Sequence, residues 1–539
     1  MFCLLDKDMM APEINKKDTP SNNFVARSAF KVALGSLLTL IAGFGLQVTI
    51  AYHFGPGAEM DAFLTALAVP LFLQAVLLTG LPFVLIPAFV QHEVEGREDE
   101  AWALAGTFFW LVAGILAVVA IGSSLFAQEI ISLSAPGLNP GKSALTASML
   151  SILMFTVPMN GLAILTVGIQ NARHNFFWPA VAPAIGSLGN LMLLLVLYQR
   201  IGPMVLAWGY LAATALIASV TVVPVLRHGW KRLIPLNDSQ MHEMARLTAP
   251  FIIFGVLGSC IPLLERYFAS SLPDGELSYL DYAFRISGIV IALAGQGIAA
   301  AIFPAMAKAY VQDGEMGLVE KTDYALRLTF AVALPAFAIL SAVAVLLVKV
   351  LFERGAFQHT ATLSVSRILP IVMVGSVISL MVGNIIVRVF YVAKDTHTVQ
   401  VVKAVRSLLY VMLAMVMVNV WGYVGLAFAQ TVIVGVSILF LFLLLMRKLR
   451  DFHADKLLKD MLRYGAASLV AFIVAWMTSN ALAFLPDLLQ LLTACFVAGT
   501  LYMTVLFRID RDIALSILEL TGILSVGAKL GFHRIALPK

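Results

Sequence analysis

The 539-residue chain is 60% hydrophobic and only 12% charged, and its mean hydropathy is +0.92. A water-soluble fold of this length needs far more polar surface to cover its core, so the composition excludes a soluble protein and indicates a polytopic membrane protein. The net charge of +5 does not indicate nucleic-acid binding, because no basic patch is interleaved with aromatic residues and because excess Lys and Arg in membrane proteins mark cytoplasmic loops.

In chain order, the first element is a polar N-terminal segment, 1–29, without the apolar core of a cleavable signal peptide, so a cytoplasmic tail is expected. A membrane crossing needs about 20 mainly apolar residues. Fourteen stretches meet that criterion: 30–53, 62–91, 102–127, 144–170, 178–199, 203–226, 247–270, 279–306, 325–352, 363–392, 401–420, 423–446, 463–484 and 487–507. The predicted fold is all-α, with about fourteen transmembrane helices.

Basic residues test this count, because Lys and Arg accumulate in cytoplasmic loops. With a cytoplasmic N-terminus, eighteen of them fall in inner loops and only three, Lys142, Arg200 and Arg354, in outer loops. Before and at the start of the eleventh span, the inner set includes Lys394, Lys403 and Arg406. The asymmetry supports fourteen crossings with both termini in the cytoplasm.

Three pairs of short motifs recur at a nearly constant offset: MDAF with LDYAF, NARHN with VAKDT, and LIPAFVQ with AIFPAMAKAY. Such matches are typical of the internal repeats of transporters. The predicted domains are two six-helix lobes of the same orientation, 30–226 and 247–446, joined by a cytoplasmic linker, 227–246. Two extra helices, 463–507, and a cytoplasmic tail with a candidate interfacial helix, 508–539, follow. Lobes of this kind normally enclose a substrate cavity.

Three arginines within the spans are candidate substrate-binding residues: Arg266, Arg285 and Arg388. A charge deep in a bilayer costs at least about 2.5 to 3.5 kcal/mol, so it tends to be paired or to face water. A guanidinium group suits phosphate, because it stays charged and donates two parallel hydrogen bonds. The alternatives are an ion pair, Arg266 with Asp281 or Arg285 with Glu265, and snorkelling of Arg388 to the inner surface.

Three acidic residues are candidate gate or ion-coupling groups: Asp61, Glu265 and Asp281. Asp61 follows a Gly-Pro-Gly turn at the outer mouth, where it is either a helix N-cap or a gate or coupling-ion residue. Glu265 is a candidate protonatable group. The membrane potential, worth about 2.3 kcal/mol per charge across 100 mV, could bias a conformational cycle without any carboxylate.

Catalytic, metal and cofactor signatures are missing from the sequence. Cys3, Cys260 and Cys495 have no redox or metal-ligand spacing, and no HExxH, GxSxG, Walker or DxD element occurs. The sequence therefore predicts no enzyme, no metal and no cofactor.

Several stretches resemble a known family. "ERYFASSLPDGELSYLDYAFRI", "LFERGAFQHTAT", "FGPGAEMDAFLTALAVP" and "SAPGLNPGKSAL" are similar to segments of the MurJ/MviN lipid II flippases, within the multidrug, oligosaccharidyl-lipid and polysaccharide exporter superfamily. The resemblance covers about 30–507. It implies a bacterial inner-membrane flippase that moves an undecaprenyl-pyrophosphate-linked sugar, lipid II-like or a polysaccharide precursor, from the inner to the outer leaflet by alternating access. Cell-envelope assembly proteins are candidate partners.

The chain also departs from that family. Leu40, Leu46 and Gln74 stand where the resemblance implies arginines lining the cavity, and Thr79 stands where it implies a glutamate. Arg266, Arg285 and Asp61 do match family positions. The resemblance thus implies a divergent member with a reduced positive cavity. The alternatives are a cation-coupled small-molecule exporter and, from another class, a membrane enzyme that polymerises or ligates lipid-linked glycans.

Overall fold

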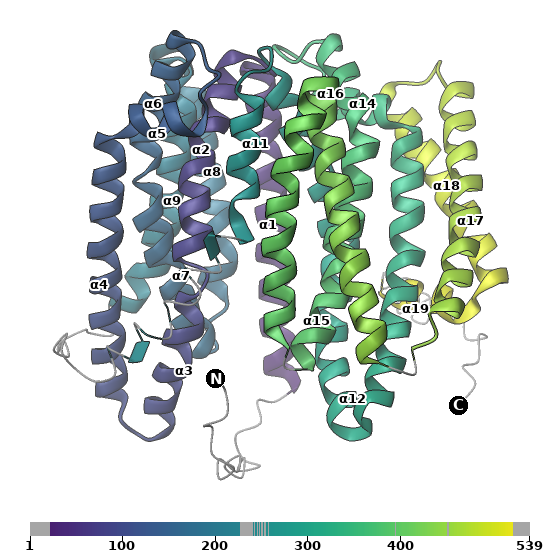
Figure 1. Cartoon of the computed structure of the whole chain (residues 1–539), viewed down its shortest axis with the longest axis horizontal. Helices are drawn as coiled ribbons and strands as arrows, with labels where there is room; N and C mark the ends of the chain where they lie inside the picture. The colour runs from purple at the N-terminus through teal and green to yellow at the C-terminus, as the bar shows by residue number, and fades with distance from the viewer. Residues whose placement is uncertain are drawn as a thin grey trace.

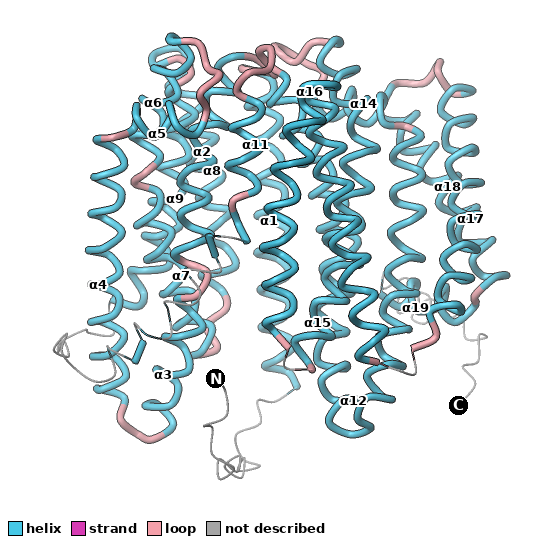
Figure 2. Tube along the Cα trace, in the orientation of Figure 1, coloured by secondary structure: helices cyan, strands magenta, loops and turns pink. Residues whose placement is uncertain are grey.

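The computed structural model describes residues 22–226, 258–393, 395–449 and 452–520, together with residues 241, 243–244, 246, 248, 252 and 255–256. Within these residues it consists of helices joined by short loops, without strands (Figures 1 and 2). Hydrocarbon offers no hydrogen-bond partners for backbone N–H and C=O groups. A chain as apolar as this one therefore pairs these groups with one another inside helices. The predicted all-α class is confirmed.

The helices before the predicted linker are α1 (Asn22–His53), α2 (Ala58–Leu77), α3 (Leu81–Val94), α4 (Glu98–Leu125), α5 (Ala127–Ser134), α6 (Pro140–Leu153), α7 (Thr156–Ala172), α8 (Phe177–Ile201) and α9 (Met204–Leu226). Those after it are α11 (Ile261–Ala269), α12 (Glu276–Ala342), α13 (Ala344–Phe352), α14 (His359–Ser376), the π-helical turn η1 (Val377–Gly383), α15 (Asn384–Val392), α16 (Thr396–Lys448), α17 (Ala454–Ala481), α18 (Asp487–Ile509) and α19 (Arg511–Leu520).

Eleven helical ranges of the described residues are long and apolar enough to cross a membrane. One of them, His397–Lys448, contains two predicted spans, because α16 turns back at Gly422, whose φ is 57°. α12 turns back in the same way at Gly314, whose φ is 64°. Both turns use the left-handed backbone region that favours glycine. The seventh predicted span, 247–270, lies partly outside the described residues, and α11 belongs to it.

The helices form two groups and a terminal pair (Figure 1). In the first group, α1 to α9, α8 packs against α1 and α9, and α2 packs against α6. In the second group, α11 to α16, α14 packs against α12, α13 and α16. The terminal pair, α17 and α18, packs against α12 at the edge of the second group. This grouping parallels the predicted lobes; most of the linker and both chain ends lie outside the described residues.

The two ends of the bundle differ, and each is named here after one residue. The Asp61 end holds the starts of α2 and α12, at the top of Figure 1. The Arg327 end holds the turn of α12 at Gly314 and the start of α17, at the bottom. The second predicted span is not one continuous helix: the helix stops at Leu77 and resumes at Leu81, around Gly80.

Lys403 and Arg406 were counted with the inner-loop charges, although both fall at the start of the predicted span 401–420. In the structure α16 begins at Thr396, so both lie inside the helix. At 1.5 Å per residue, Arg406 is about 15 Å along the axis from that start. A count of charges per loop does not show that a helix can carry two basic residues on one face near its end.

A charged cluster ties the terminal pair to the second group at the Arg327 end. Arg327 of α12 pairs through Nε with Asp460 of α17 at 3.1 Å and through Nη2 with Asp510, the residue after α18. The Tyr464 hydroxyl donates to Asp510 at 2.5 Å. Burial raises the pKa of the Asp510 carboxyl, but hydrogen bonds from Tyr464 and from the Ile513 amide, with the charge of Arg327, hold that pKa below its ordinary value.

Replacing Arg327 with glutamine is expected to loosen α17 and α18. The change leaves Asp460 and Asp510 without their shared cation, at a cost of roughly 1 to 3 kcal/mol for partly buried carboxylates. Amide hydrogen exchange should become faster over 454–481. Arg463→Gln is the matched control, because Arg463 also pairs with Asp460, at 3.4 Å, but is mostly exposed. Equal exchange in both variants would contradict this role of Arg327.

Candidate functional site

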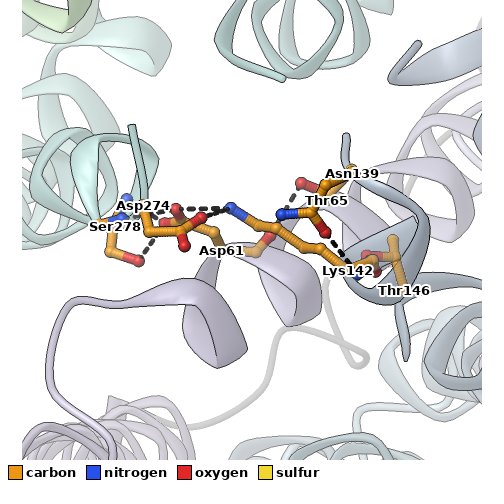
Figure 3. Close-up of polar contacts among 8 residues, drawn as sticks. Asp61, Thr65, Asn139, Lys142, Thr146, Asp274 and Ser278 are labelled. Atoms are coloured by element: carbon orange, nitrogen blue, oxygen red, sulfur yellow. Dashed lines mark hydrogen bonds and ion pairs between the residues drawn. The ribbon is translucent and has the colours of Figure 1, made fainter. Parts of the chain in front are cut away.

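Asp61 connects the two helical groups. It lies in the first turn of α2 and is only 2% exposed. Its carboxylate accepts hydrogen bonds from the backbone N–H groups of Gly275, at 2.7 Å, and Ser278, at 2.9 Å, and from the Ser278 hydroxyl, at 2.5 Å (Figure 3). These donors form the N-terminus of α12, where Gly275 has no side chain to cap the helix. Asp61 therefore caps a helix of the second group instead of its own.

Lys142 completes this arrangement. Its Nζ lies 3.1 Å from Asp61 and 2.8 Å from Asp274, so it binds one acid from each group (Figure 3). The Lys142 side chain is only 9% exposed. Asn139 accepts a hydrogen bond from the Lys142 amide at 2.9 Å and caps α6. This cap fixes the position of the Lys142 backbone, from which the side chain extends. Asp61, Lys142, Asp274, Gly275 and Ser278 are called the Asp61 network below.

Two backbone contacts close the same end of the bundle. The Ala356 amide donates to the Tyr52 carbonyl at 2.8 Å, and the Gly137 amide donates to the Ser270 hydroxyl at 3.0 Å. A Cβ atom on Gly355 would lie 2.3 Å from the Tyr52 carbonyl oxygen, so only glycine permits this approach. The two groups thus touch through loops as well as through the Asp61 network.

Two candidate arginines and two candidate acids form one cluster, whose side chains are between 7% and 27% exposed. Arg266 of α11 lies 3.8 Å from Glu265 and 3.9 Å from Asp281 of α12. Arg285 donates from Nε to Asp281, four residues earlier on its own helix. The structure thus contains the Arg266–Asp281 pair, whereas Arg285 pairs with Asp281 and not with Glu265. The cluster holds two positive and two negative side chains.

Several buried hydrogen-bond donors at this cluster lack a partner in the part of the chain that the structure describes. Both ion-pair distances of Arg266 are too long for hydrogen bonds, and its buried Nε and Nη1 atoms have no hydrogen-bond partner among the described residues. Tyr410 lies near Glu265 and Arg266. Its hydroxyl is buried and likewise has no hydrogen-bond partner among the described residues. Unused buried donors are costly, so a ligand rich in anionic oxygens would complete the site.

Arg388 is not part of this cluster. It lies on α15, toward the Arg327 end, with its guanidinium carbon 5.4 Å from the centre of the Phe303 ring. Such a cation–π contact helps to hold the arginine in place. The structure therefore separates Arg388 from Arg266 and Arg285.

The first group adds no cation at the positions where the resemblance implied arginines. Leu46 is buried, and Leu40 is 37% exposed. Gln74 donates to the Thr156 hydroxyl at 3.3 Å, so its amide group already has a partner in the first group. The arginines placed inside the bundle come from the second group instead.

Sequence reasoning singled out only Asp61 among the five members of the Asp61 network, and Asp274 and Gly275 were not considered as site residues. Lys142 was assigned to an outer loop, and Ser278 was not singled out. The motif Asn-Pro-Gly-Lys indicates the start of a helix, but nothing in the sequence relates Lys142 to an acid 81 residues earlier. Among the described residues, no group of three or more His, Cys, Asp or Glu side chains could hold a metal ion.

Comparisons with known proteins give a consistent result. A family model described as "Lipid II flippase MurJ" matches residues 50–494. A probable lipid II flippase MurJ of Bdellovibrio bacteriovorus is 26% identical over 452 residues, covering 82% of this chain and 86% of the relative. A lipid II flippase MurJ of Burkholderia cenocepacia is 25% identical over 478 residues, covering 84% and 90%.

Solved structures show the same fold. A lipid II flippase MurJ in an inward closed conformation matches with a TM-score of 0.76 at 20% identity, over 89% of this chain and 99% of that one. An inward-facing multidrug resistance transporter of the MATE family matches with a TM-score of 0.66 at 16% identity, over 79% and 98%.

Proposed function

This chain belongs to the MurJ lipid II flippase family, and from that premise we propose that it moves a polyprenyl-pyrophosphate-linked saccharide between the leaflets of the bacterial inner membrane. The family consists of transporters, so the chain is not an enzyme. Its substrate is a lipid II-like or related saccharide precursor carried on a diphosphate.

The observation that carries this proposal is the set of buried hydrogen-bond donors around Arg266 that have no partner in the described ranges of the chain. Its Nε and Nη1 atoms lack hydrogen bonds, and its two acids lie 3.8 and 3.9 Å away. Diphosphate oxygens accept such donors, and a guanidinium group presents them in parallel. We assign Arg266 and Arg285 to the diphosphate, while Glu265 and Asp281 hold the two arginines when the site is empty.

The Arg327 end faces the cytoplasm in this proposal. Basic residues accumulate in cytoplasmic loops, and Arg97, Arg173, Arg447 and Lys459 lie in the loops and helix ends of the Arg327 end. The Asp61 end then faces the outside, and the Asp61 network is the outer closure. Substrate enters from the cytoplasmic side while this closure is intact.

Transport requires the outer closure to open. The helical groups are the two lobes that rock against one another, as in other repeat-built transporters. When the closure opens, a few polar contacts are replaced by contacts to water. The chief ones are the hydrogen bonds from the α12 N-terminus to the Asp61 carboxylate. Since α12 also carries Asp281 and Arg285, movement of its N-terminus moves the substrate site with the closure.

Reconstitution tests the proposal. Purified protein in vesicles that contain a fluorescent undecaprenyl-pyrophosphate saccharide should expose lipid from the inner leaflet to a membrane-impermeant quencher, whereas protein-free vesicles should not. A fluorescent cationic drug in parallel vesicles tests the small-molecule exporter alternative. Quenching limited to the outer leaflet with the saccharide, or transport of the drug alone, would contradict the proposed function.

A further inference from the structure

Lys403 and Arg406 lie on the inward face of α16. The opposite face is apolar and exposed, with Val401, Val405 and Leu408 between 42% and 65% exposed, as a lipid-facing surface requires. Arg406, in contrast, shares the face of the buried Tyr410, four residues further along the helix. The two cations therefore point away from lipid, and snorkelling along the lipid face does not account for them.

These two residues lack an acidic partner among the described residues. Arg406 lies near Cys260 and Lys403, and neither of these is a carboxylate. The Arg406 Nε atom is buried and has no hydrogen-bond partner. Lys403 precedes Arg406 by three residues, so the two like charges are neighbours on one helix face and repel each other.

Three other basic residues inside or between the helical groups are paired with acids. Arg285 pairs with Asp281, Arg327 with Asp460 and Asp510, and Lys142 with Asp61 and Asp274. Desolvated cations without a counter-charge are unfavourable in a bilayer. At Lys403 and Arg406 the bundle therefore carries two positive charges that no nearby acid among the described residues balances.

We propose that Lys403 and Arg406 form an anion-binding pair that receives the diphosphate of the lipid-linked substrate as it enters from the Arg327 end. This inference rests on the proposed function and names residues for its substrate. The pair adds positive charge from the second group. The first group lacks such charge at Leu40, Leu46 and Gln74. A diphosphate carries enough negative charge to neutralise both side chains.

The pair also marks the start of a path toward the Arg266 cluster. Along α16, Tyr410 lies about 6 Å beyond Arg406, and Tyr410 is close enough to Arg266 and Glu265 for charge interactions. The order from the Arg327 end is thus Lys403, Arg406, Tyr410 and Arg266. A diphosphate would first contact Lys403 and Arg406, which have no acidic partner among the described residues. It would then reach Arg266 and Arg285, which must release their carboxylate partners before they can bind phosphate.

Binding measurements on the full chain in nanodiscs test the pair. The variants are Lys403→Gln, Arg406→Gln and the double variant, and the probe is fluorescent undecaprenyl pyrophosphate. Each single change should weaken binding about tenfold and the double change about a hundredfold, because each removes charge-assisted hydrogen bonds. The matched control is Lys459→Gln with Arg447→Gln, which removes the same charge from exposed positions and should bind as the wild type does.

Two further probes identify the source of the anion. Inorganic pyrophosphate should compete for the same site more weakly than the lipid, and its competition should be lost in the double variant. Phosphatidylglycerol added to the nanodiscs should not compete. Unchanged probe affinity in the double variant, or full competition by phosphatidylglycerol, would overturn the inference.

The vesicle assay separates this inference from the proposed function. If the wild type moves the saccharide lipid and the double variant moves it equally fast, the anion-binding pair is wrong and the proposed function stands. If the wild type moves no lipid, the proposed function fails whatever the variants do. A folded double variant, checked by an unchanged melting temperature, that moves lipid at a small fraction of the wild-type rate supports both.

Discussion

Replacing Asp61 with alanine should open the Asp61 end of the bundle and reduce transport about a hundredfold. The carboxylate accepts three hydrogen bonds from Gly275 and Ser278 and pairs with Lys142, all at a position that is 2% exposed. Its loss leaves the N-terminus of α12 uncapped and Lys142 with one acid instead of two. We expect a cost of about 3 kcal/mol to the closed state, which is about a hundredfold in population.

Spin labels can measure this opening. Gln128→Cys in the first group and Thr360→Cys in the second place exposed labels near the Asp61 end, after Cys3, Cys260 and Cys495 have been replaced. The distance distribution should be narrow in the parent and shift to longer distances with Asp61→Ala. Glu59→Ala is the matched control, because Glu59 is an exposed acid in the same helical turn. An unchanged distribution with Asp61→Ala would show that Asp61 does not hold the groups together.

Arg285→Ala and Arg266→Ala should each reduce transport at least about a hundredfold while the chain still inserts into the membrane. Each change removes a guanidinium group with two parallel charge-assisted donors, worth about 3 kcal/mol to a bound diphosphate. Arg285→Ala leaves Asp281 with Arg266 at 3.9 Å, so the fold should tolerate it. Arg266→Ala leaves Glu265 buried without its cation and should also lower the melting temperature.

Conservative and matched variants separate binding from stability. Arg266→Lys keeps a charge near Glu265 but lacks the planar fork, so it should restore the melting temperature without restoring transport. Arg200→Ala is the control for loss of an arginine, because Arg200 is exposed in the last turn of α8. Normal transport by folded Arg285→Ala in the vesicle assay would remove Arg285 from the substrate site.

Much of the fold could be predicted from the sequence, because one physical requirement dominates it. Each hydrocarbon crossing needs a long apolar helix, and turns at glycines such as Gly314 and Gly422 mark where the chain reverses. The Arg266–Asp281 contact could also be predicted, because the short connection between α11 and α12 brings the two helices together. Local sequence carries this kind of information.

The rest of the site depends on contacts that are remote in the sequence. Asp61 caps a helix that begins more than two hundred residues later, and this pairing follows only from how the two groups dock. Arg285 was considered as a partner for Glu265 but bonds to Asp281, because a residue four positions away on the same helix is always within reach. Lys403 and Arg406 were counted only as inner-side charges, because hydropathy does not show which face of a helix a charge occupies.

Native mass spectrometry of the protein purified with its lipids tests the central claim, that buried guanidinium groups of the second group hold the diphosphate of a lipid-linked saccharide. The account predicts that the wild type carries a polyprenyl-pyrophosphate saccharide in a defined stoichiometry and that the Arg285→Ala variant carries much less of it. Wild-type protein that carries only phospholipids under the same conditions, or equal amounts of the saccharide lipid on both proteins, would contradict the account.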